Sequence, residues 1–224
     1  MDFSDRLPLL IKRHTQLTLE LSELEKRGIR VVTRADKSIY PQKLRLKFKD
    51  TGIAIPSVIY YVGELSLVNS FSAVAVVGSR DLTSDSGTQK FTELFVEKSV
   101  QSGFAISSGG AKGIDHIAES TSRCCGGISI ITVPDGLSKR ILDPEIRNSI
   151  LEENSVYLSL THPNSIFSGY NAMARNKVIY ALSEYAMIVT CFFLQILAVS
   201  LILIKEELGL VRMNVQNLIC QNSW

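Results

Sequence analysis

The chain has 224 residues, which is enough for one sizeable hydrophobic core and a smaller accessory segment. Hydrophobic residues make up 46% and charged residues 21%, and the net charge of +2 excludes recognition of an anionic partner by overall charge alone. The cysteines and histidines lack zinc-site spacing, so we expect no metal, no cofactor and free thiols. The N-terminus lacks the order of a signal peptide, which favours a cytoplasmic protein.

Residues 1–70 are expected to form a helix followed by an extended lead-in segment. Leucines at near-helical spacing predict a helix over residues 4–27, and a short strand is predicted at 29–33. Residues 58–63 close this segment. Between these two stretches, Lys43, Arg45 and Lys47 alternate with Leu44 and Leu46, which predicts an amphipathic strand over residues 42–50 with a basic face. That face is either a solvated surface or a stripe that faces nucleic acid.

From residue 71 to 190 short apolar runs alternate with helical segments. Strands are predicted at residues 73–77, 104–107, 128–133, 156–160 and 186–190, and helices at 87–101, 114–125, 144–153 and 171–183. This order predicts an α/β, Rossmann-like domain with a mainly parallel sheet that is covered by helices on both faces. Ligands of such sheets bind at the carboxyl ends of the strands.

Residues 191–224 form an atypical apolar tail. Ala186 to Ile204 contains no charge and approaches the ~20 apolar residues of a membrane span. Polar residues interrupt this run, and its first residues are needed for the fifth strand. We therefore expect a buried strand followed by a helix, and no membrane.

Three motifs follow or flank the predicted strands. Gly78-Ser79-Arg80 ends the strand at 73–77, where a glycine allows backbone amides to approach an anion and the arginine adds a forked donor. Ser107 to Asp115 follows the next strand and opens a helix. Its Gly109, Gly110, Lys112 and Gly113 predict an anion cradle of free amides, although the spacing matches neither a Walker A loop nor a dinucleotide fingerprint.

The third motif, Asn171 to Ser183, places Arg175 and Lys177 near the predicted start of a helix. A basic first turn is unfavourable against the helix dipole, so an anionic ligand there is one explanation and simple exposure is the other. Lys139 and Arg140, just after the strand at 128–133, are second-rank candidates from position alone.

The order GSR, SGGAKGID, ARNKVIYALS resembles the DprA/Smf family of DNA-processing proteins. The lead-in GIRVVTRADKSIYPQKL and IPSVIYYVGE is similar to that family too, so the resemblance spans residues 28–190. It implies a protein that binds single-stranded DNA without sequence preference, assists a RecA-type recombinase during DNA uptake, and is not an enzyme. It also implies a homodimer, although the sequence leaves the oligomeric state open.

The resemblance implies particular roles for the motif residues. Arg80, Lys112, Arg175 and Lys177 would contact phosphates, and Asn176 would be a polar contact. The residues that would shape the loops are Gly78, Ser79, Gly109, Gly110 and Gly113.

The sequence departs from the family pattern in two places. The family has a histidine a few residues after its GID, whereas here His116 follows Asp115 directly, so no role is carried over. After residue 190 a glycine-containing loop and a further helix are expected, but the apolar tail stands there instead. An altered reading frame near Cys191 is one hypothesis, which translating the other frames of the locus would test.

An enzyme remains the alternative. Asp115 and Glu119 share a helix face, although a solvated acidic surface is the simpler interpretation. The glycine-rich cleft is similar to that of LOG-like proteins that handle nucleoside monophosphates, yet the threonine and glutamate of their signature are missing. A nucleotide-sensing or nucleotide-hydrolysing protein is therefore the second interpretation.

Overall fold

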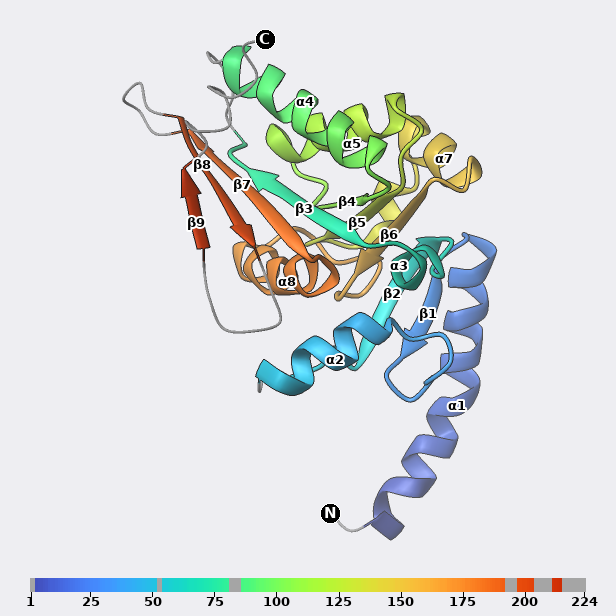
Figure 1. Ribbon diagram of the computed structural model, residues 1–224. Helices are drawn as coiled ribbons and strands as arrows, with labels where there is room; N and C mark the ends of the chain where they lie inside the picture. The colour runs from blue at the N-terminus through green and yellow to red at the C-terminus, as the bar shows by residue number, and fades with distance from the viewer. Residues whose placement is uncertain (1–2, 52–53, 81–85, 192–196, 204–210, 215–224) are drawn as a thin grey trace.

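The computed structural model describes residues 3–51, 54–80, 86–191, 197–203 and 211–214, and within them nine strands form one sheet in the order β1-β2-β6-β5-β4-β3-β7-β8-β9 (Figure 1). The strands are β1 (Arg30–Thr33), β2 (Val58–Gly63), β3 (Ala73–Gly78), β4 (Ala105–Ser108), β5 (Ser129–Val133), β6 (Ser155–Ser159), β7 (Tyr185–Cys191), β8 (Leu197–Leu203) and β9 (Val211–Asn214). The helices are α1 (Phe3–Lys26), α2 (Gln42–Thr51), α3 (Leu67–Ser70), α4 (Ser86–Gln101), α5 (Ile114–Cys124), α6 (Leu137–Arg140), α7 (Pro144–Leu151) and α8 (Gly169–Leu182).

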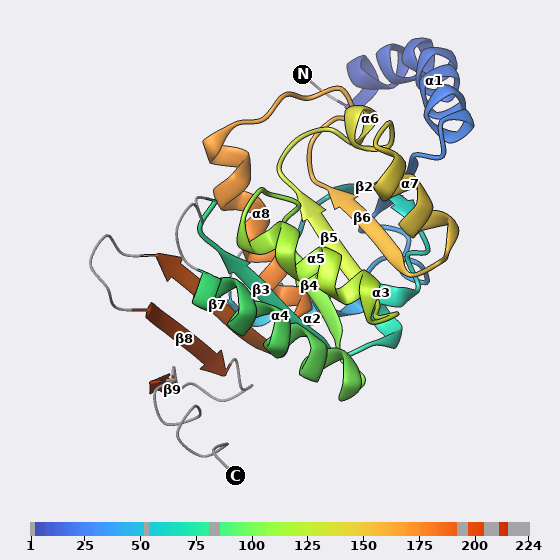
Figure 2. The same ribbon diagram turned by 90° about the horizontal axis from the view of Figure 1, so that it is seen from above.

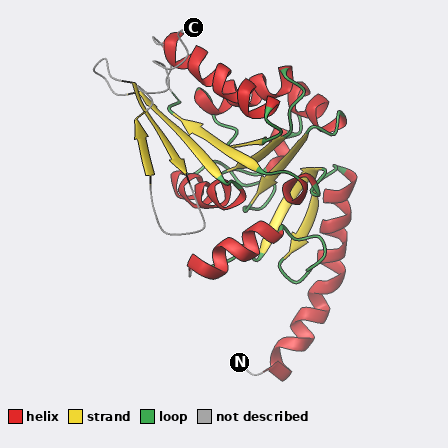
Figure 3. Cartoon of the chain, viewed as in Figure 1, coloured by secondary structure: helices red, strands yellow, loops and turns green. Residues whose placement is uncertain are grey.

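The centre of the sheet is parallel, from β6 through β5, β4 and β3 to β7. Its strands are apolar on both faces because helices cover both (Figures 2 and 3). Val74 and Val76 of β3 pack with α4 and α5, whereas Ala75 and Val77 point the other way, toward Ile179 of α8. The predicted Rossmann-like α/β fold is confirmed.

The connections leave one switch point in this sheet. β3, β4, β5 and β6 are neighbours in the sheet in the same order as in the sequence. α8 then crosses the opposite face of the sheet, and the next strand, β7, pairs with the free edge of β3 (Figure 2). The carboxyl ends of β3 and β7 therefore lie where the chain changes from one face to the other, which is the usual ligand position in an open α/β sheet.

The lead-in segment extends the same sheet. β1 pairs antiparallel with β2, and β2 pairs antiparallel with β6, with Tyr61 opposite Leu158. α1 and β1 agree with the helix and the strand predicted for this region, whereas no strand was predicted at β2. The division of the chain at residues 70 and 190 stays a prediction.

The strand predicted over residues 42–50 is wrong, because these residues form the helix α2. Leu44 is completely buried with Val178 and Leu182, while Leu46 is 66% exposed. Residues two apart share a face in a strand but not in a helix, so the burial of only one leucine agrees with the helix. The alternation of basic residues with leucine has the period of two that is typical of a strand, and this is why it predicted the wrong element.

The helix predicted after β7 is also wrong where the tail is described, since residues 197–203 form β8 along the edge of β7. β7 would otherwise leave a row of backbone donors and acceptors unpaired, and β8 satisfies them. No helix in the described part of the chain is both long and apolar enough to cross a membrane.

Candidate functional site

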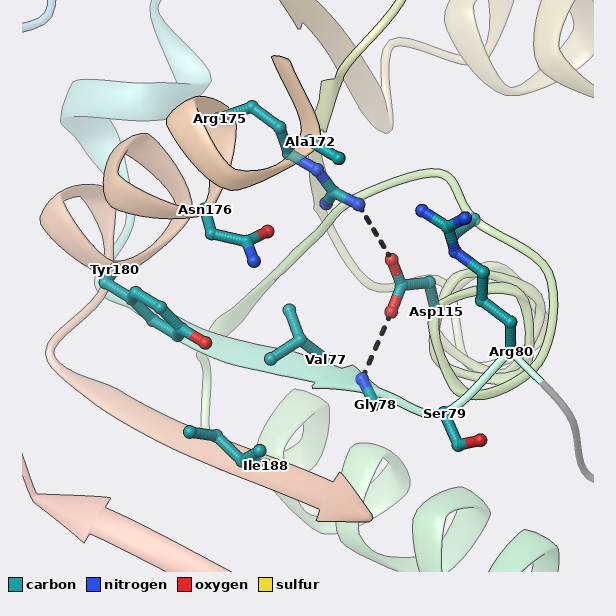
Figure 4. A pocket seen from close by; sticks show the side chains of 11 residues that line it. Val77, Gly78, Ser79, Arg80, Asp115, Ala172, Arg175, Asn176, Tyr180 and Ile188 are labelled. Atoms are coloured by element: carbon teal, nitrogen blue, oxygen red, sulfur yellow. Dashed lines mark hydrogen bonds and ion pairs between the residues drawn. The ribbon is translucent and has the colours of Figure 1, made fainter. Parts of the chain in front are cut away.

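A cavity of about 520 Å³ lies at the carboxyl ends of β3 and β7, between α8 and the start of α5 (Figure 4). Its walls come from the loop after β3, the glycine-rich loop, α8 and β7. The lining residues are Val77, Gly78, Ser79, Arg80, Ala111, Asp115, Ala172, Arg175, Asn176, Tyr180 and Ile188. The two glycine motifs and α8 thus meet at one place, as their positions after the strands predict.

Two of the residues that line the cavity, Arg175 of α8 and Asp115 of α5, form an ion pair. Arg175 is 5% exposed and Asp115 is 2% exposed, and the Nη2 of Arg175 lies 3.6 Å from Oδ2 of Asp115. The other carboxylate oxygen of Asp115 accepts a hydrogen bond of 3.3 Å from the backbone N–H of Gly78 (Figure 4). The pair therefore connects α8, α5 and the end of β3.

The electrostatics of the cavity favour an anionic ligand. Burial raises the pKa of Asp115, against the lowering effect of the Arg175 charge and the backbone N–H groups of Gly78 and Ala111. Burial lowers the pKa of Arg175, the Arg80 charge nearby lowers it further and Asp115 opposes both, yet a guanidinium remains charged in proteins. Two guanidinium groups thus face one carboxylate.

Arg175 keeps donor groups that nothing in the described residues satisfies. Its Nε and Nη1 are buried and have no hydrogen-bond partner there. The guanidinium lies so close to Gly109 that a Cβ atom at that position would collide with it. A buried donor without a partner costs roughly 1–3 kcal/mol, so a ligand that accepts from Arg175 would remove this cost.

Arg80 lies at the entrance of the cavity. Its guanidinium carbon is 4.9 Å from the centre of the Phe167 ring, which is a cation–π contact. The Arg80 side chain is exposed, so it reaches both solvent and the cavity.

The glycine-rich loop is held by its own contacts. The Gly110 N–H donates to Oε1 of Glu119 at 2.8 Å, and the Gly110 carbonyl accepts from Nη1 of Arg140 at 2.7 Å. Arg140 also forms an ion pair with Asp135 at 3.0 Å. This second-rank candidate for phosphate binding therefore stabilises the glycine-rich loop through its bond to Gly110. The prediction of free amides is therefore wrong for Gly110.

Gly113 joins the glycine-rich loop to the loop after β3. The N–H of Ile114 donates to the carbonyl of Ser79 at 3.1 Å, so this amide too is not free. Gly113 has a φ of +81°, and a Cβ atom there would collide with the same carbonyl. Only glycine allows the two loops to approach so closely.

The predicted site residues fall into three groups. Gly78, Ser79, Arg80, Arg175 and Asn176 line the cavity, whereas Gly109, Gly110 and Gly113 shape the loop beside it. Lys112 and Lys177 are exposed and lie outside the lining, and so does the exposed Lys139.

The predicted solvated acidic face is wrong. Asp115 is buried, and Glu119 is half-buried with its carboxyl group against the glycine loop. Burial, together with the nearby Asp115 charge, raises the pKa of Glu119 to about 8. The pairing of Asp115 with Arg175 and the lining role of Tyr180 were missed, since only the tertiary fold brings α5 and α8 together.

Comparison with known sequences decides the family. The profile of the family described as DNA recombination-mediator protein A matches residues 30–192. The chain belongs to this family. The predicted resemblance to DprA/Smf proteins is thus confirmed.

Individual DprA-family relatives agree. The chain is 31% identical over 159 residues to protein Smf of Escherichia coli (strain K12), covering 69% of this chain and 40% of that protein. An X-ray structure of DNA processing protein A from Streptococcus pneumoniae matches 75% of this chain and 56% of its own, with a TM-score of 0.57 and 27% identity.

A third relative shows the fold alone. DNA processing protein A from Helicobacter pylori, whose structure is described for its single-stranded DNA binding mode, matches 63% of this chain and 64% of its own, with a TM-score of 0.51 and 24% identity. The chain spans less than two thirds of the length of each of these relatives.

Proposed function

We propose that this DprA-family chain binds single-stranded DNA and holds a phosphate group in the cavity between the Gly78-Ser79-Arg80 loop and α8. The observation that carries the proposal is the buried Arg175 with two donor atoms unsatisfied among the described residues. A phosphate oxygen accepts such donors, and a forked guanidinium fits it well. Membership of a DNA recombination-mediator family supports the choice of DNA as the anion.

Each predicted residue has a place in this proposal. Arg80 and Arg175 contact the phosphate in the cavity, and the Asn176 amide adds a polar contact (Figure 4). The exposed Lys112 and Lys177 attract neighbouring phosphates from outside the cavity. Gly78, Ser79, Gly109, Gly110 and Gly113 shape the two loops. Because these contacts go to the sugar-phosphate backbone of the DNA, we expect binding to be independent of base sequence and sensitive to salt.

Fluorescence anisotropy with a labelled oligonucleotide of mixed sequence tests the proposal. Arg80→Ala removes an exposed cation at the cavity, so we expect Kd to rise on the order of tenfold, which is about 1.4 kcal/mol. A salt titration should give a slope of log Kd against log salt reduced by about 0.7, the loss of one phosphate contact to a single strand. Arg175→Lys keeps the charge near Asp115 but loses the forked donors, and should weaken binding similarly.

The matched control is Arg147→Ala, which removes another exposed arginine, on α7 and outside the lining of the cavity. Its affinity and salt slope should equal those of the unmodified chain. If Arg80→Ala and Arg147→Ala bind DNA alike, the cavity is not the DNA site.

A single nucleotide is a second candidate ligand for the same cavity. The volume of about 520 Å³ lies within the range of small-molecule sites, and Asp115 places a carboxylate in the wall. A nucleoside monophosphate that binds saturably and releases free base would support a nucleotide hydrolase. Displacement of the oligonucleotide without base release would support a binding protein that recognises DNA.

We propose two protein partners for the chain, a RecA-type recombinase and a second copy of the chain itself. Membership of a DNA recombination-mediator family supports assistance to a RecA-type recombinase. A homodimer is proposed from the resemblance of the motifs alone. Strand-exchange assays with a recombinase, and light scattering of the isolated chain, measure these two properties directly.

A further inference from the structure

The basic residues of α2 and the preceding loop are separate from the cavity beneath α8. Lys43 is the member of this group with an ion pair in the described structure, since its Nζ lies 4.0 Å from Oε1 of Glu184. Arg45 lies on another side of the helix, where it lines a second cleft of about 430 Å³. The residues that line this cleft are Lys37, Gln42, Arg45, Leu46 and Ile55.

The charge around this cleft is mainly positive. Arg34 and Arg45 both lie close enough to Tyr40 for their charges to lower its pKa, although burial raises that pKa to about 12. Within the described residues, neither of these arginines nor Lys37 forms an ion pair. Asp36, next to Lys37 in the chain, contributes a negative charge; its carboxylate accepts hydrogen bonds from the N–H and hydroxyl of Thr33, which hold it in the turn after β1.

The cleft also presents aliphatic surface to solvent. Leu46 is 66% exposed and Ile55 is half-buried beside it, while the neighbouring Ile39 is 53% exposed. None of the lining residues that the structure describes is aromatic, whereas aliphatic and basic side chains are both present. Cations around an aliphatic floor fit a peptide that carries both carboxylates and aliphatic side chains.

We propose that the cleft between α2 and the loop at residues 34–37 is a docking site for an acidic peptide segment of a partner protein with an aliphatic side chain. The aliphatic side chain occupies the floor formed by Leu46 and Ile55, and its flanking carboxylates pair with Arg45 and Lys37. This surface is distinct from the DNA cavity, because the two clefts share no lining residue.

The test uses the full chain and a short fluorescein-labelled peptide in which aspartate and leucine alternate. We expect saturable binding, and at least about a tenfold rise in Kd for Lys37→Glu/Arg45→Glu. Leu46→Ser should weaken binding as well, because it removes the aliphatic floor. Peptides that alternate lysine with leucine, or aspartate with serine, should bind at least about tenfold more weakly, since each lacks one of the two features.

The control variant is Lys90→Glu/Lys98→Glu, which makes the same charge change on exposed lysines of α4. It should bind the peptide like the unmodified chain. The labelled oligonucleotide should bind equally to the cleft variant and the control variant, so this result is separate from the test of the DNA cavity. The inference is overturned if both variants bind the peptide alike, or if the cleft variant loses oligonucleotide affinity while the peptide does not bind.

Discussion

Gly109 lies against the guanidinium of Arg175, and this contact makes it the sharpest single test of the cavity. In Gly109→Ala the new methyl group would collide with the flexible end of Arg175. We expect the side chain to shift, a stability loss of about 1–3 kcal/mol, and oligonucleotide affinity lower on the order of tenfold. Thermal unfolding and anisotropy measure the two effects.

Gly169→Ala is the matched control for this substitution. Gly169 begins α8, and a Cβ atom there would meet nothing within 4 Å. Its stability should be unchanged or slightly higher because alanine favours the helix, and its affinity should be unchanged. Full affinity in Gly109→Ala would show that the position of Arg175 does not matter for binding.

Glu119 makes the stability of the chain depend on pH. Its pKa is raised from 4.5 to about 8, so the folded state favours the neutral carboxyl group and takes up a proton between these two values. The resulting stabilisation is complete below pH about 4.5 and is lost as the pH rises through about 8. Relative to the unmodified chain, Glu119→Gln should therefore gain stability with increasing pH, by on the order of a few kcal/mol in total.

Urea unfolding at several pH values between about 5 and 9 measures this difference. The control is Glu152→Gln, which changes an exposed carboxylate just after α7 and should leave the pH profile unchanged. A constant difference between Glu119→Gln and the unmodified chain across this range would contradict the proton uptake.

At the scale of elements, the sequence predicts well wherever periodicity and burial agree. The apolar runs that became β3 to β6 are buried on both faces, so their apolar composition distinguishes them from the amphipathic helices between them. Their order also places the motifs after β3 and β4 at the same edge of the sheet. This is why Gly78, Ser79 and Arg80 could be predicted to meet the glycine-rich loop.

Prediction fails where tertiary contacts decide. The alternation of cations and leucines along α2 predicts a strand, whereas the packing of Leu44 under α8 stabilises a helix. The sequence predicts Arg175 near the start of a helix, but α8 begins at Gly169, where the Ser168 hydroxyl accepts a hydrogen bond from the Asn171 N–H at 3.1 Å. The placement of α8 over the sheet brings Arg175 to Asp115 of α5, which no pattern in either helix indicates.

At the scale of the whole molecule, the lead-in and the Rossmann-like domain share one sheet and one core. Val32, Tyr40 and Ile59 belong to the same buried cluster as Leu158 and Leu182. By contrast, residues 13–22 of α1 are exposed. We therefore expect β1 and β2 to unfold together with β5 and β6, and the amides of residues 13–22 to exchange with solvent earlier.

A core substitution in the lead-in tests whether that cooperativity reaches the parallel sheet. Ile59 is fully buried in β2, so Ile59→Ala should lower the free energy of unfolding by about 2–5 kcal/mol and speed the exchange of amides in β5 and β6 as much as in β2. Leu19→Ala removes a 63% exposed side chain from α1 and should change stability by less than about 0.5 kcal/mol. Faster exchange confined to β1 and β2 would instead show that the lead-in unfolds separately, because the β2–β6 pairing would then be too weak to couple it to the parallel sheet.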